Sequence, residues 1–203
     1  MQRGLFITFE GGDGCGKTTQ IDLLDEYLRN KGYKTLITRE PGAKGLGTKL
    51  REILLNYDGE VSSKCESFLF LADRAQHVDC IIKPAIEEGV IVLCDRHADS
   101  TVAYQGYGRG VNIDELKHLN NLATSGLKPD LTIVLDVDVE TSMQRVGKEK
   151  DRMESAGIEF FERVREGFLD IAKQEPERVK VISSSDTIEN IHKKIKELVD
   201  KIC

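Results

Sequence analysis

The sequence has no excess of basic residues and no long hydrophobic run. Its 29 Lys and Arg are outnumbered by 35 Asp and Glu, so the 203-residue chain carries a net charge of −6. A general nucleic-acid binder needs a basic face, so this balance argues against that class. No apolar stretch reaches the roughly 20 residues that span a bilayer. The N-terminus enters an apolar run without a signal-peptide pattern. We expect a cytoplasmic protein with no nucleic-acid partner and no membrane contact.

The spacing of the cysteines matches no known type of site. Cys15, Cys65, Cys80, Cys94 and Cys203 are odd in number and match neither a metal site nor a redox pair. We expect reduced thiols, as in a cytoplasmic protein. Cys15 precedes an expected helix, a position that lowers a thiol pKa. It is either a small spacer or a reactive thiol, whose alkylation would abolish activity and which bound nucleotide would protect.

Internal repeats, low-complexity tracts and linkers are missing as well, which predicts a single domain over residues 1–203. Apolar runs predict strands at residues 4–10, 33–38, 90–94, 131–135 and 179–182. Periodic apolar residues predict helices near 17–31, 50–54, 67–88, 114–124 and 188–199, with Pro84 kinking the third or starting a new piece. Residues 140–173 are expected to be mostly helical, with an interruption from Gly147 to Gly157, and residues 100–109 are expected to form a loop and a helix start. This alternation predicts an α/β fold with a five-stranded parallel sheet flanked by helices.

Residues 4–31 carry the most informative pattern: an apolar run, a glycine-rich stretch and an amphipathic helix. Residues 11–18 fit the phosphate-loop pattern of Gly, four residues, Gly-Lys-Thr. Glycine lets backbone N–H groups approach phosphate oxygens, and the helix N-terminus favours the anion. Lys17 can reach the β- and γ-phosphates, and the Thr18 hydroxyl can bind Mg²⁺. We predict a three-layer P-loop NTPase fold whose ATP site comprises Gly11, Gly12, Asp13, Gly14, Cys15, Gly16, Lys17, Thr18 and Thr19.

Asp95 and Arg96 directly follow the buried strand at residues 90–94. Ligands of open α/β sheets bind at the carboxyl ends of the strands. Asp95 is therefore a candidate second Mg²⁺ anchor, acting through water, and Arg96 a candidate for stabilising a transferring phosphoryl group. The alternative is a solvated ion pair at a strand end.

Phe70 and Arg74 lie four residues apart on an expected helix and can face one pocket. An aromatic face and a guanidinium suit a nucleobase, although phenylalanine on a helix is more often a core residue. The four histidines, His77, His97, His118 and His192, have no metal-ligand spacing. We interpret them as structural or exposed, because an anionic phosphate acceptor needs positioning rather than a general base.

Over nearly its whole length the sequence resembles the bacterial-type thymidylate kinases, which are nucleoside-monophosphate kinases. The segments that carry the resemblance are Phe9 to Thr19, Thr38 to Gly42, Leu69 to His77, Asp95 to His97, Ser100, Ala103 to Gly106 and Pro129 to Thr132. The resemblance implies transfer of the γ-phosphoryl group of ATP to dTMP, giving dTDP and ADP with Mg²⁺, in dTTP synthesis.

The resemblance also implies a role for individual residues. Phe70 would stack on thymine, and Arg74 and Gln105 would hydrogen-bond the base. Tyr104 would lie against the sugar and disfavour a 2′-hydroxyl, and Asp13 would meet the 3′-hydroxyl. Arg51 and Arg96 would hold the dTMP phosphate, and Glu40 and Ser100 would complete the dTMP site. The implied catalytic residues are Lys17, Arg96, Arg152 and Asp13.

A short lid is expected at about residues 145–157. Some family members carry a catalytic arginine in the phosphate loop, but in this sequence the loop has Gly14 and contains no arginine. Arg152 fits the type that carries it in the lid, with Arg145 as the alternative. Ala43 departs from the usual double glycine after Glu-Pro. The family forms homodimers, for which the helical stretch 67–88 is a candidate.

Three other functions remain open on the residues alone. One is another nucleoside-monophosphate kinase, acting on CMP or AMP, which rates measured with a panel of monophosphate substrates would distinguish from a thymidylate kinase. A GTP-dependent switch protein would need an Asn-Lys-x-Asp sequence, which is missing. A regulator without activity would not need intact Lys17, Asp95, Arg96 and Arg152. Discrimination against dUMP rests on one methyl group, which contributes only about 1–3 kcal/mol.

Overall fold

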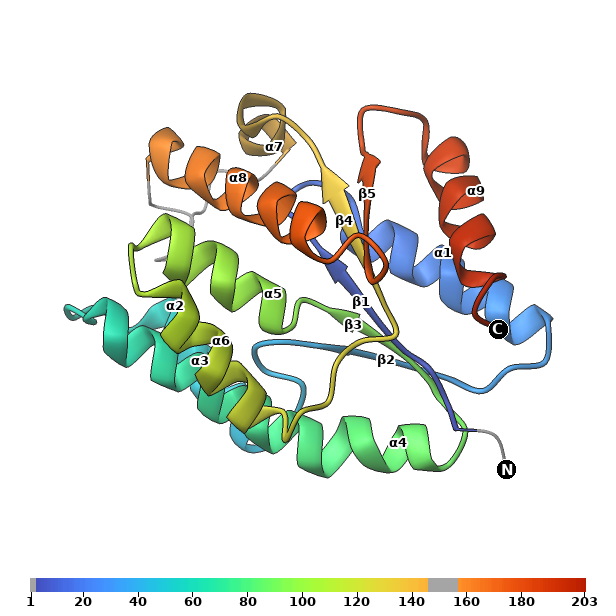
Figure 1. Cartoon of the computed structure of the whole chain (residues 1–203), viewed down its shortest axis with the longest axis horizontal. Helices are drawn as coiled ribbons and strands as arrows, with labels where there is room; N and C mark the ends of the chain where they lie inside the picture. Colours follow the sequence, from blue (N-terminus) through green and yellow to red (C-terminus); the bar gives the residue numbers. More distant parts are fainter. Residues whose placement is uncertain (1–2, 146–156) are drawn as a thin grey trace.

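The computed structural model describes residues 3–145 and 157–203. Its five strands are β1 (Phe6–Glu10), β2 (Thr35–Arg39), β3 (Ile91–Asp95), β4 (Leu131–Asp136) and β5 (Val179–Ser183). They form one parallel sheet in the order β2-β3-β1-β4-β5. Figure 1 shows helices on both faces of this sheet. The predicted α/β fold with five parallel strands is confirmed.

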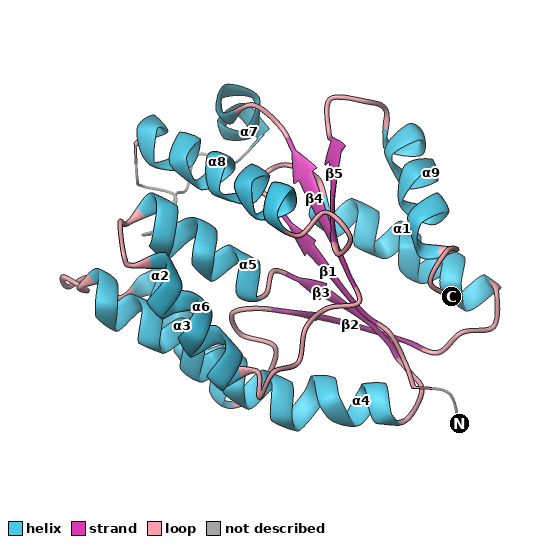
Figure 2. Cartoon of the chain, viewed as in Figure 1, coloured by secondary structure: helices cyan, strands magenta, loops and turns pink. Residues whose placement is uncertain are grey.

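The helices form the two outer layers of the molecule (Figure 2). Helices α1 (Lys17–Asn30) and α9 (Ile188–Val199) pack together on one face. The other face carries α8 (Ile158–Gln174), α4 (Lys83–Glu87), and the helical segment α5 (Ala98–Thr101) with its π-helical continuation η2 (Val102–Gly108). Every residue of β1 is buried. Burial on both faces explains why the central strands β1, β3 and β4 are mostly apolar, whereas the edge strands β2 and β5 are partly exposed.

The predicted helix at 67–88 is in fact three consecutive pieces. Helix α3 (Ser63–His77) begins earlier, because the Ser62 side chain caps it by accepting from the Cys65 N–H. A π-helical segment, η1 (Val78–Ile82), follows, and then α4. Pro84 lies in the first turn of α4, directly after η1, and cannot donate a backbone hydrogen bond to the preceding helical turn. Pro84 therefore starts a new piece.

The remaining helices are α2 (Leu46–Asn56), α6 (Ile113–Ala123) and α7 (Val139–Arg145). Helices α2 and α7 contribute residues to the cavity at the carboxyl ends of the strands, whereas α6 packs against α3 and η2. Helices α7 and α8 account for the described part of the predicted helical stretch 140–173, and most of the predicted lid lies outside the described residues. No helix in the described ranges is long and apolar enough to cross a membrane. All five cysteines lie in those ranges and are free thiols.

The prediction of a loop at residues 100–109 is wrong, because this stretch is the helical segment α5 and η2. Its glycines serve close packing rather than a turn. A Cβ atom at Gly108 would lie 2.5 Å from the Phe160 ring, and one at Gly167 of α8 would lie 2.8 Å from the Tyr107 ring. Glycines on both elements thus let η2 and α8 approach closely. Interpreting glycine only as a loop residue does not predict this close packing.

Candidate active site

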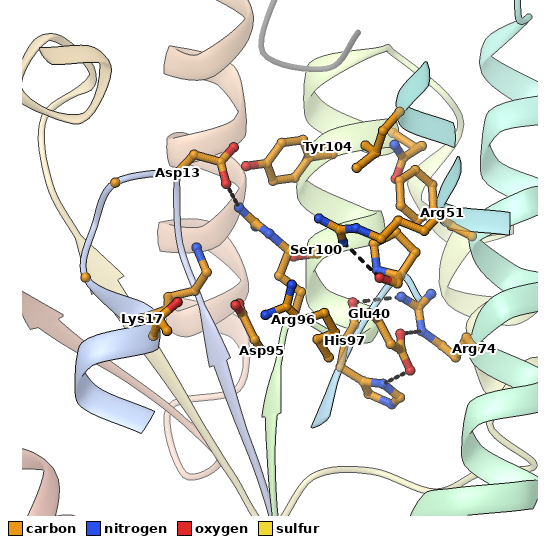
Figure 3. Close-up of a pocket in the computed structure, with 18 of the residues that line it drawn as sticks. Asp13, Lys17, Glu40, Arg51, Arg74, Asp95, Arg96, His97, Ser100 and Tyr104 are labelled. Carbon is orange, nitrogen blue, oxygen red and sulfur yellow. Dashed lines mark hydrogen bonds and ion pairs between the residues drawn. The ribbon is translucent and has the colours of Figure 1, made fainter. Parts of the chain in front are cut away.

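A cavity of about 430 Å³ opens where the carboxyl ends of β1, β2 and β3 meet (Figure 3). The predicted site residues that line it are Asp13, Gly14, Gly16, Lys17, Thr18, Thr19, Glu40, Arg51, Phe70, Arg74, Asp95, Arg96, Ser100, Tyr104, Gln105 and Arg145. Gly11, Gly12 and Cys15 do not line it, and Arg152 lies outside the described residues. Residues from segments far apart in the sequence therefore share one cavity.

The phosphate loop has the backbone shape that its glycines predict. Gly11, Gly14 and Gly16 all have positive φ angles, and a Cβ atom at Gly11 would collide with the carbonyl oxygen of Leu135. No side chain caps the first turn of α1, so its N–H groups are available to an anion. Lys17 Nζ donates to the carbonyl oxygens of Gly11 (3.3 Å) and Gly12 (3.0 Å). This geometry suits a triphosphate.

Cys15 is buried beneath the loop, with Sγ 3.8 Å from Lys17 Nζ. A thiol at 2% exposure is a poor target for a reagent in solution. Its burial favours the interpretation of Cys15 as a small spacer.

Arg96 spans the floor of the cavity. Its Nη1 donates to the Gly11 carbonyl oxygen (2.9 Å) and to Ser100 Oγ (3.2 Å), while Nη2 donates to Asp13 Oδ1 (2.6 Å). Its φ of 67° is unusual for a residue with a side chain. Burial raises the pKa of Asp13, but the charges of Arg96 and Lys17 outweigh this effect and leave that pKa lowered. Asp13 is therefore an ionised hydrogen-bond acceptor in the cavity.

Asp95 presents an unpaired carboxylate oxygen. Its Oδ1 atom is buried and has no hydrogen-bond partner among the described residues. This carboxylate and the Thr18 hydroxyl belong to residues that line the same cavity, and together they offer oxygen ligands that suit a hydrated Mg²⁺ ion. Within residues 3–145 and 157–203, no cluster of three or more His, Cys, Asp or Glu could hold a metal alone. A cation here would rely on water and substrate phosphates.

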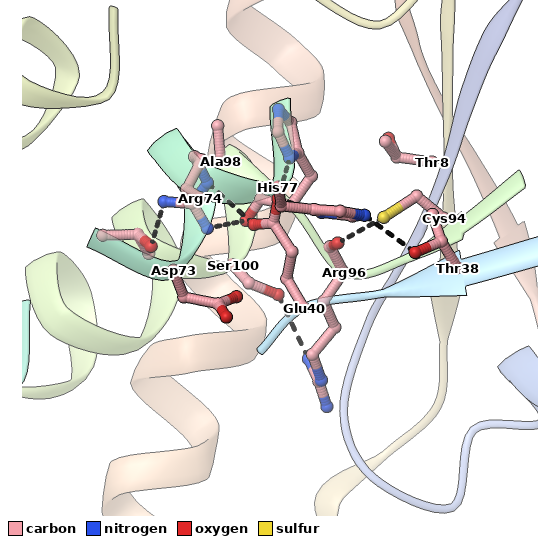
Figure 4. A network of polar contacts seen from close by, with 12 residues as sticks. Thr8, Thr38, Glu40, Asp73, Arg74, His77, Cys94, Arg96, Ala98 and Ser100 are labelled. Atoms are coloured by element: carbon pink, nitrogen blue, oxygen red, sulfur yellow. Dashed lines mark hydrogen bonds and ion pairs between the residues drawn. The ribbon is translucent and has the colours of Figure 1, made fainter. Parts of the chain in front are cut away.

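Glu40 and Arg74 form the centre of a buried polar network (Figure 4). Arg74 is only 1% exposed. Its Nε donates to Glu40 Oε2 (2.9 Å), Nη1 to Thr101 Oγ1 (2.8 Å) and Asn120 Oδ1 (2.6 Å), and Nη2 to the His97 carbonyl oxygen (2.9 Å). Four of its five N–H groups are thereby used, and one on Nη2 is left for a ligand.

His77 and His97 hold the other oxygen of Glu40. Their Nδ1 atoms lie 2.8 and 2.9 Å from Glu40 Oε1. Burial raises the pKa of Glu40, but His97, Arg74 and these hydrogen bonds leave it well below its usual value. Both histidines are structural, as the sequence indicated. Their link to Glu40 was missed, because nothing in the sequence connects His77 or His97 to a residue 37 or 57 positions earlier.

Glu10 is a second residue that sequence reasoning missed. It ends β1, is fully buried, and accepts hydrogen bonds from the His97 N–H (2.8 Å) and from Ser100 Oγ (2.5 Å). Burial and the nearby charge of Asp99 raise its pKa from 4.5 to about 7. The only signal in the sequence was its position directly before the phosphate loop.

The Glu10→Gln variant is expected to remove a pH dependence of stability. Between pH 4.5 and about 7 the folded state holds a proton on Glu10 that the unfolded state has lost. This proton stabilises the fold fully below pH 4.5, by about 3 kcal/mol, and the effect is lost as pH rises through 7. Glutamine mimics the protonated acid, so urea unfolding between pH 5 and 8 should show a flatter profile. An unchanged slope would contradict the assignment.

The far end of the cavity combines aromatic and polar side chains. Phe70 is half-buried, while Tyr104 and Gln105 on η2 are buried. Arg51 Nη1 donates to the Pro41 carbonyl oxygen (2.9 Å), and this bond holds its guanidinium at the cavity wall. The Arg96 guanidinium lies 4.9 Å from the centre of the Tyr104 ring. A nucleobase and sugar fit this end by chemistry.

Helix α7 is joined to the phosphate loop. Ser142 Oγ donates to the Asp13 carbonyl oxygen, and Arg145 Nη1 lies 3.5 Å from the Gly14 carbonyl oxygen. Arg145 therefore lies at the cavity next to the loop. The choice between Arg145 and Arg152 stays a prediction, because Arg152 is not described.

Comparison with known proteins identifies the family to which the chain belongs. A family model described as thymidylate kinase matches residues 9–195. The chain belongs to the thymidylate kinase family.

Individual members of the thymidylate kinase family agree closely with this chain. The enzyme of Sulfurihydrogenibium is 49% identical and the alignment covers 94% of each chain. That of Desulfovibrio desulfuricans is 47% identical over 92% of this chain and 91% of its own. The crystal structure of thymidylate kinase from Ehrlichia chaffeensis has a TM-score of 0.81 at 39% identity, covering 98% of this chain and 99% of that one.

Thymidylate kinases phosphorylate dTMP to dTDP with ATP in dTTP synthesis, and this chain is an enzyme of that kind. Membership over nearly the whole chain decides against a GTP-dependent switch protein, which shares only the phosphate loop. It also decides against a kinase for CMP or AMP.

Proposed function

We propose that one domain, residues 1–203, performs this reaction with ATP on the phosphate loop and dTMP at the aromatic end of the cavity. The central position of Arg96 carries the proposal, because its guanidinium contacts both the phosphate loop and Ser100. An arginine there can contact the phosphate of dTMP and the transferring group together. The attacking oxygen is already anionic, so the residues need only align it with the γ-phosphorus.

The ATP side follows from the loop geometry. Backbone N–H groups of residues 11–19 would hold the phosphates, and Lys17 Nζ would exchange its carbonyl partners for phosphate oxygens. Mg²⁺ would be held by the Thr18 hydroxyl and, through water, by Asp95, where it would neutralise developing charge on the phosphates. The unpaired Oδ1 of Asp95 supports this assignment.

Asp95→Asn is expected to lower kcat about a hundredfold and to raise the Mg²⁺ concentration for half-maximal rate, because the amide is a weaker partner for metal-bound water. Titration of the rate with Mg²⁺ at fixed ATP and dTMP measures both quantities. Asp58→Asn, at an exposed position outside the cavity, is the matched control. An unchanged Mg²⁺ requirement would remove Asp95 from the metal site.

The dTMP side uses residues with positions that suit their proposed contacts. Phe70 would stack on thymine, with Arg74 and Gln105 at the base edge. Tyr104 would lie against the sugar, and ionised Asp13 would accept from the 3′-hydroxyl. Arg51, Arg96 and Ser100 would bind the phosphate. Both oxygens of Glu40 already accept bonds from Arg74, His77 and His97, so Glu40 would act by holding Arg74 in place.

A lid at about residues 145–157 would exclude water, which otherwise consumes ATP. We expect Arg152→Ala to lower kcat far more than it weakens dTMP binding, by about a thousandfold if Arg152 contacts the transferring group. Arg145→Ala is the matched comparison, since Arg145 lies next to the Gly14 carbonyl oxygen. Single-turnover rates and dTMP binding are measured for both variants. A normal rate for Arg152→Ala with a large loss for Arg145→Ala would reverse the assignment.

A cytoplasmic homodimer completes the proposed function. Helices α2 and α3 pack against each other and expose large apolar side chains, among them Leu46, Ile53 and Phe68. Contact with a second copy would remove this surface from water. Sedimentation velocity of the full chain at micromolar concentration tests it, and a strictly monomeric protein would contradict it.

A further inference from the structure

Gln105 has a defined amide orientation in the cavity. Its Nε2 donates to Glu66 Oε1 on α3 at 2.9 Å, and both side chains are 1% exposed. A carboxylate only accepts hydrogen bonds, so the amide must turn its nitrogen toward Glu66. Arg109 Nε lies 3.5 Å from the same oxygen and supplies a compensating positive charge. The orientation of the amide therefore follows from chemistry.

The amide oxygen of Gln105 is the part left to meet a ligand. Gln105 lines the cavity, and no side chain or backbone group in the described ranges donates to its Oε1. Arg74, whose Nη2 keeps one N–H group without an acceptor among the described residues, lines the same cavity. This wall therefore offers one hydrogen-bond donor, from Arg74, and one acceptor, from Gln105.

That pattern matches one pyrimidine and opposes another. Thymine and uracil present a carbonyl acceptor at O4 and a donor at N3–H. Cytosine presents an amino donor at N4 and an acceptor at N3, so both groups are reversed. If the Gln105 amide rotated by 180°, its nitrogen would meet N3 of cytosine. An unrestrained amide can make that rotation with little change of shape.

We propose that Glu66 is a positioning residue that sets the specificity for thymine over cytosine by preventing this rotation. The proposal rests on the base-binding roles proposed above for Arg74 and Gln105. Rejection by mismatched polar groups can exceed a ten-thousandfold, whereas one methyl group is worth roughly 10–200-fold. Glu66 thus controls the dTMP-to-dCMP ratio of kcat/KM. It has no influence on the dTMP-to-dUMP ratio, because thymine and uracil share the same hydrogen-bonding edge.

The test is Glu66→Gln in the full-length enzyme, with kcat/KM measured for dTMP, dUMP and dCMP. A glutamine at position 66 can donate as well as accept, so it permits both orientations of Gln105. The dTMP-to-dCMP ratio should fall at least about tenfold, while the dTMP-to-dUMP ratio stays within about threefold. Glu175→Gln also removes a glutamate paired with an arginine, Arg178, outside this cavity, and should leave both ratios unchanged.

Two further variants separate the possible failures. Gln105→Leu should itself lower the dTMP-to-dCMP ratio, and adding Glu66→Gln to it should have no further effect. If Gln105→Leu leaves the ratio unchanged, the proposed base-binding role of Gln105 is wrong. If Gln105→Leu lowers it but Glu66→Gln does not, the role of Glu66 alone is wrong, and Glu66 merely connects α3 to η2. Should Glu66→Gln fold poorly, Glu66→Gln with Arg109→Gln removes both charges and carries the same expectation.

Discussion

Replacing Arg96 by alanine is expected to lower kcat about a thousandfold or more. The guanidinium lies between the phosphate loop, Asp13 and Ser100, where the transferring phosphoryl group would gain negative charge. Alanine also removes the partner of the Asp13 carboxylate, whose repulsion of phosphate would then be uncompensated. Steady-state and single-turnover rates with ATP and dTMP measure the loss.

Arg96→Gly separates chemistry from folding. Arg96 adopts a φ of 67°, which glycine tolerates without strain. This variant should retain or improve its thermal stability and still lose the same activity. Arg29→Ala, an exposed arginine paired with Asp25, is the matched control and should be near normal. A kcat for Arg96→Gly within about tenfold of the parent would exclude Arg96 from the phosphoryl-transfer step.

Replacing Arg74 by methionine is expected to destabilise the fold strongly as well as weaken dTMP binding. Glu40, at 4% exposure, would lose its buried guanidinium partner, and such losses cost about 3–5 kcal/mol. For a chain of this size that corresponds to a fall in Tm of about 10 °C. Loss of a contact to the base would by itself raise the KM for dTMP and spare ATP binding. The buried network adds a folding defect, which would damage both.

Glu40→Gln in the Arg74→Met background should recover part of the lost stability, because the unpaired charge is gone. Thermal unfolding of the parent, both single variants and the double variant measures the coupling. The recovery should leave dTMP binding impaired, since the N–H group proposed to meet the base is still missing. Purely additive losses would show that Glu40 and Arg74 are not energetically linked.

The phosphate loop and the individual strands of the sheet could be predicted because each is encoded in one continuous stretch of sequence. Residues 11–18 combine glycines, a lysine and a threonine at fixed spacing, and the apolar runs that became β1, β3 and β4 are buried on both faces. Local composition led to a wrong prediction at η2, where Gly106 and Gly108 suggested a loop instead of a helical segment. Their function is close contact with neighbouring elements, which depends on a partner far away in the sequence.

The supporting network of the site could not be predicted for the same reason. Glu40, Arg74 and His97 come from three separate segments, and only the fold brings them within hydrogen-bonding distance. Glu66 looks in sequence like a surface glutamate of an amphipathic helix, yet it is buried against Gln105. The resemblance named the cavity residues, but their supporting partners became visible only in three dimensions.

The most direct test of the account is ADP release with ATP and Mg²⁺ against dTMP, dUMP, dCMP, CMP and AMP, with a control lacking any acceptor. The account predicts strong turnover with dTMP, weaker turnover with dUMP, and little with the other three, because only thymine and uracil match Arg74 and Gln105. Preference for dCMP, CMP or AMP would contradict the base-binding assignment while retaining the phosphate loop. ADP release that is independent of every acceptor would contradict phosphoryl transfer to a nucleotide.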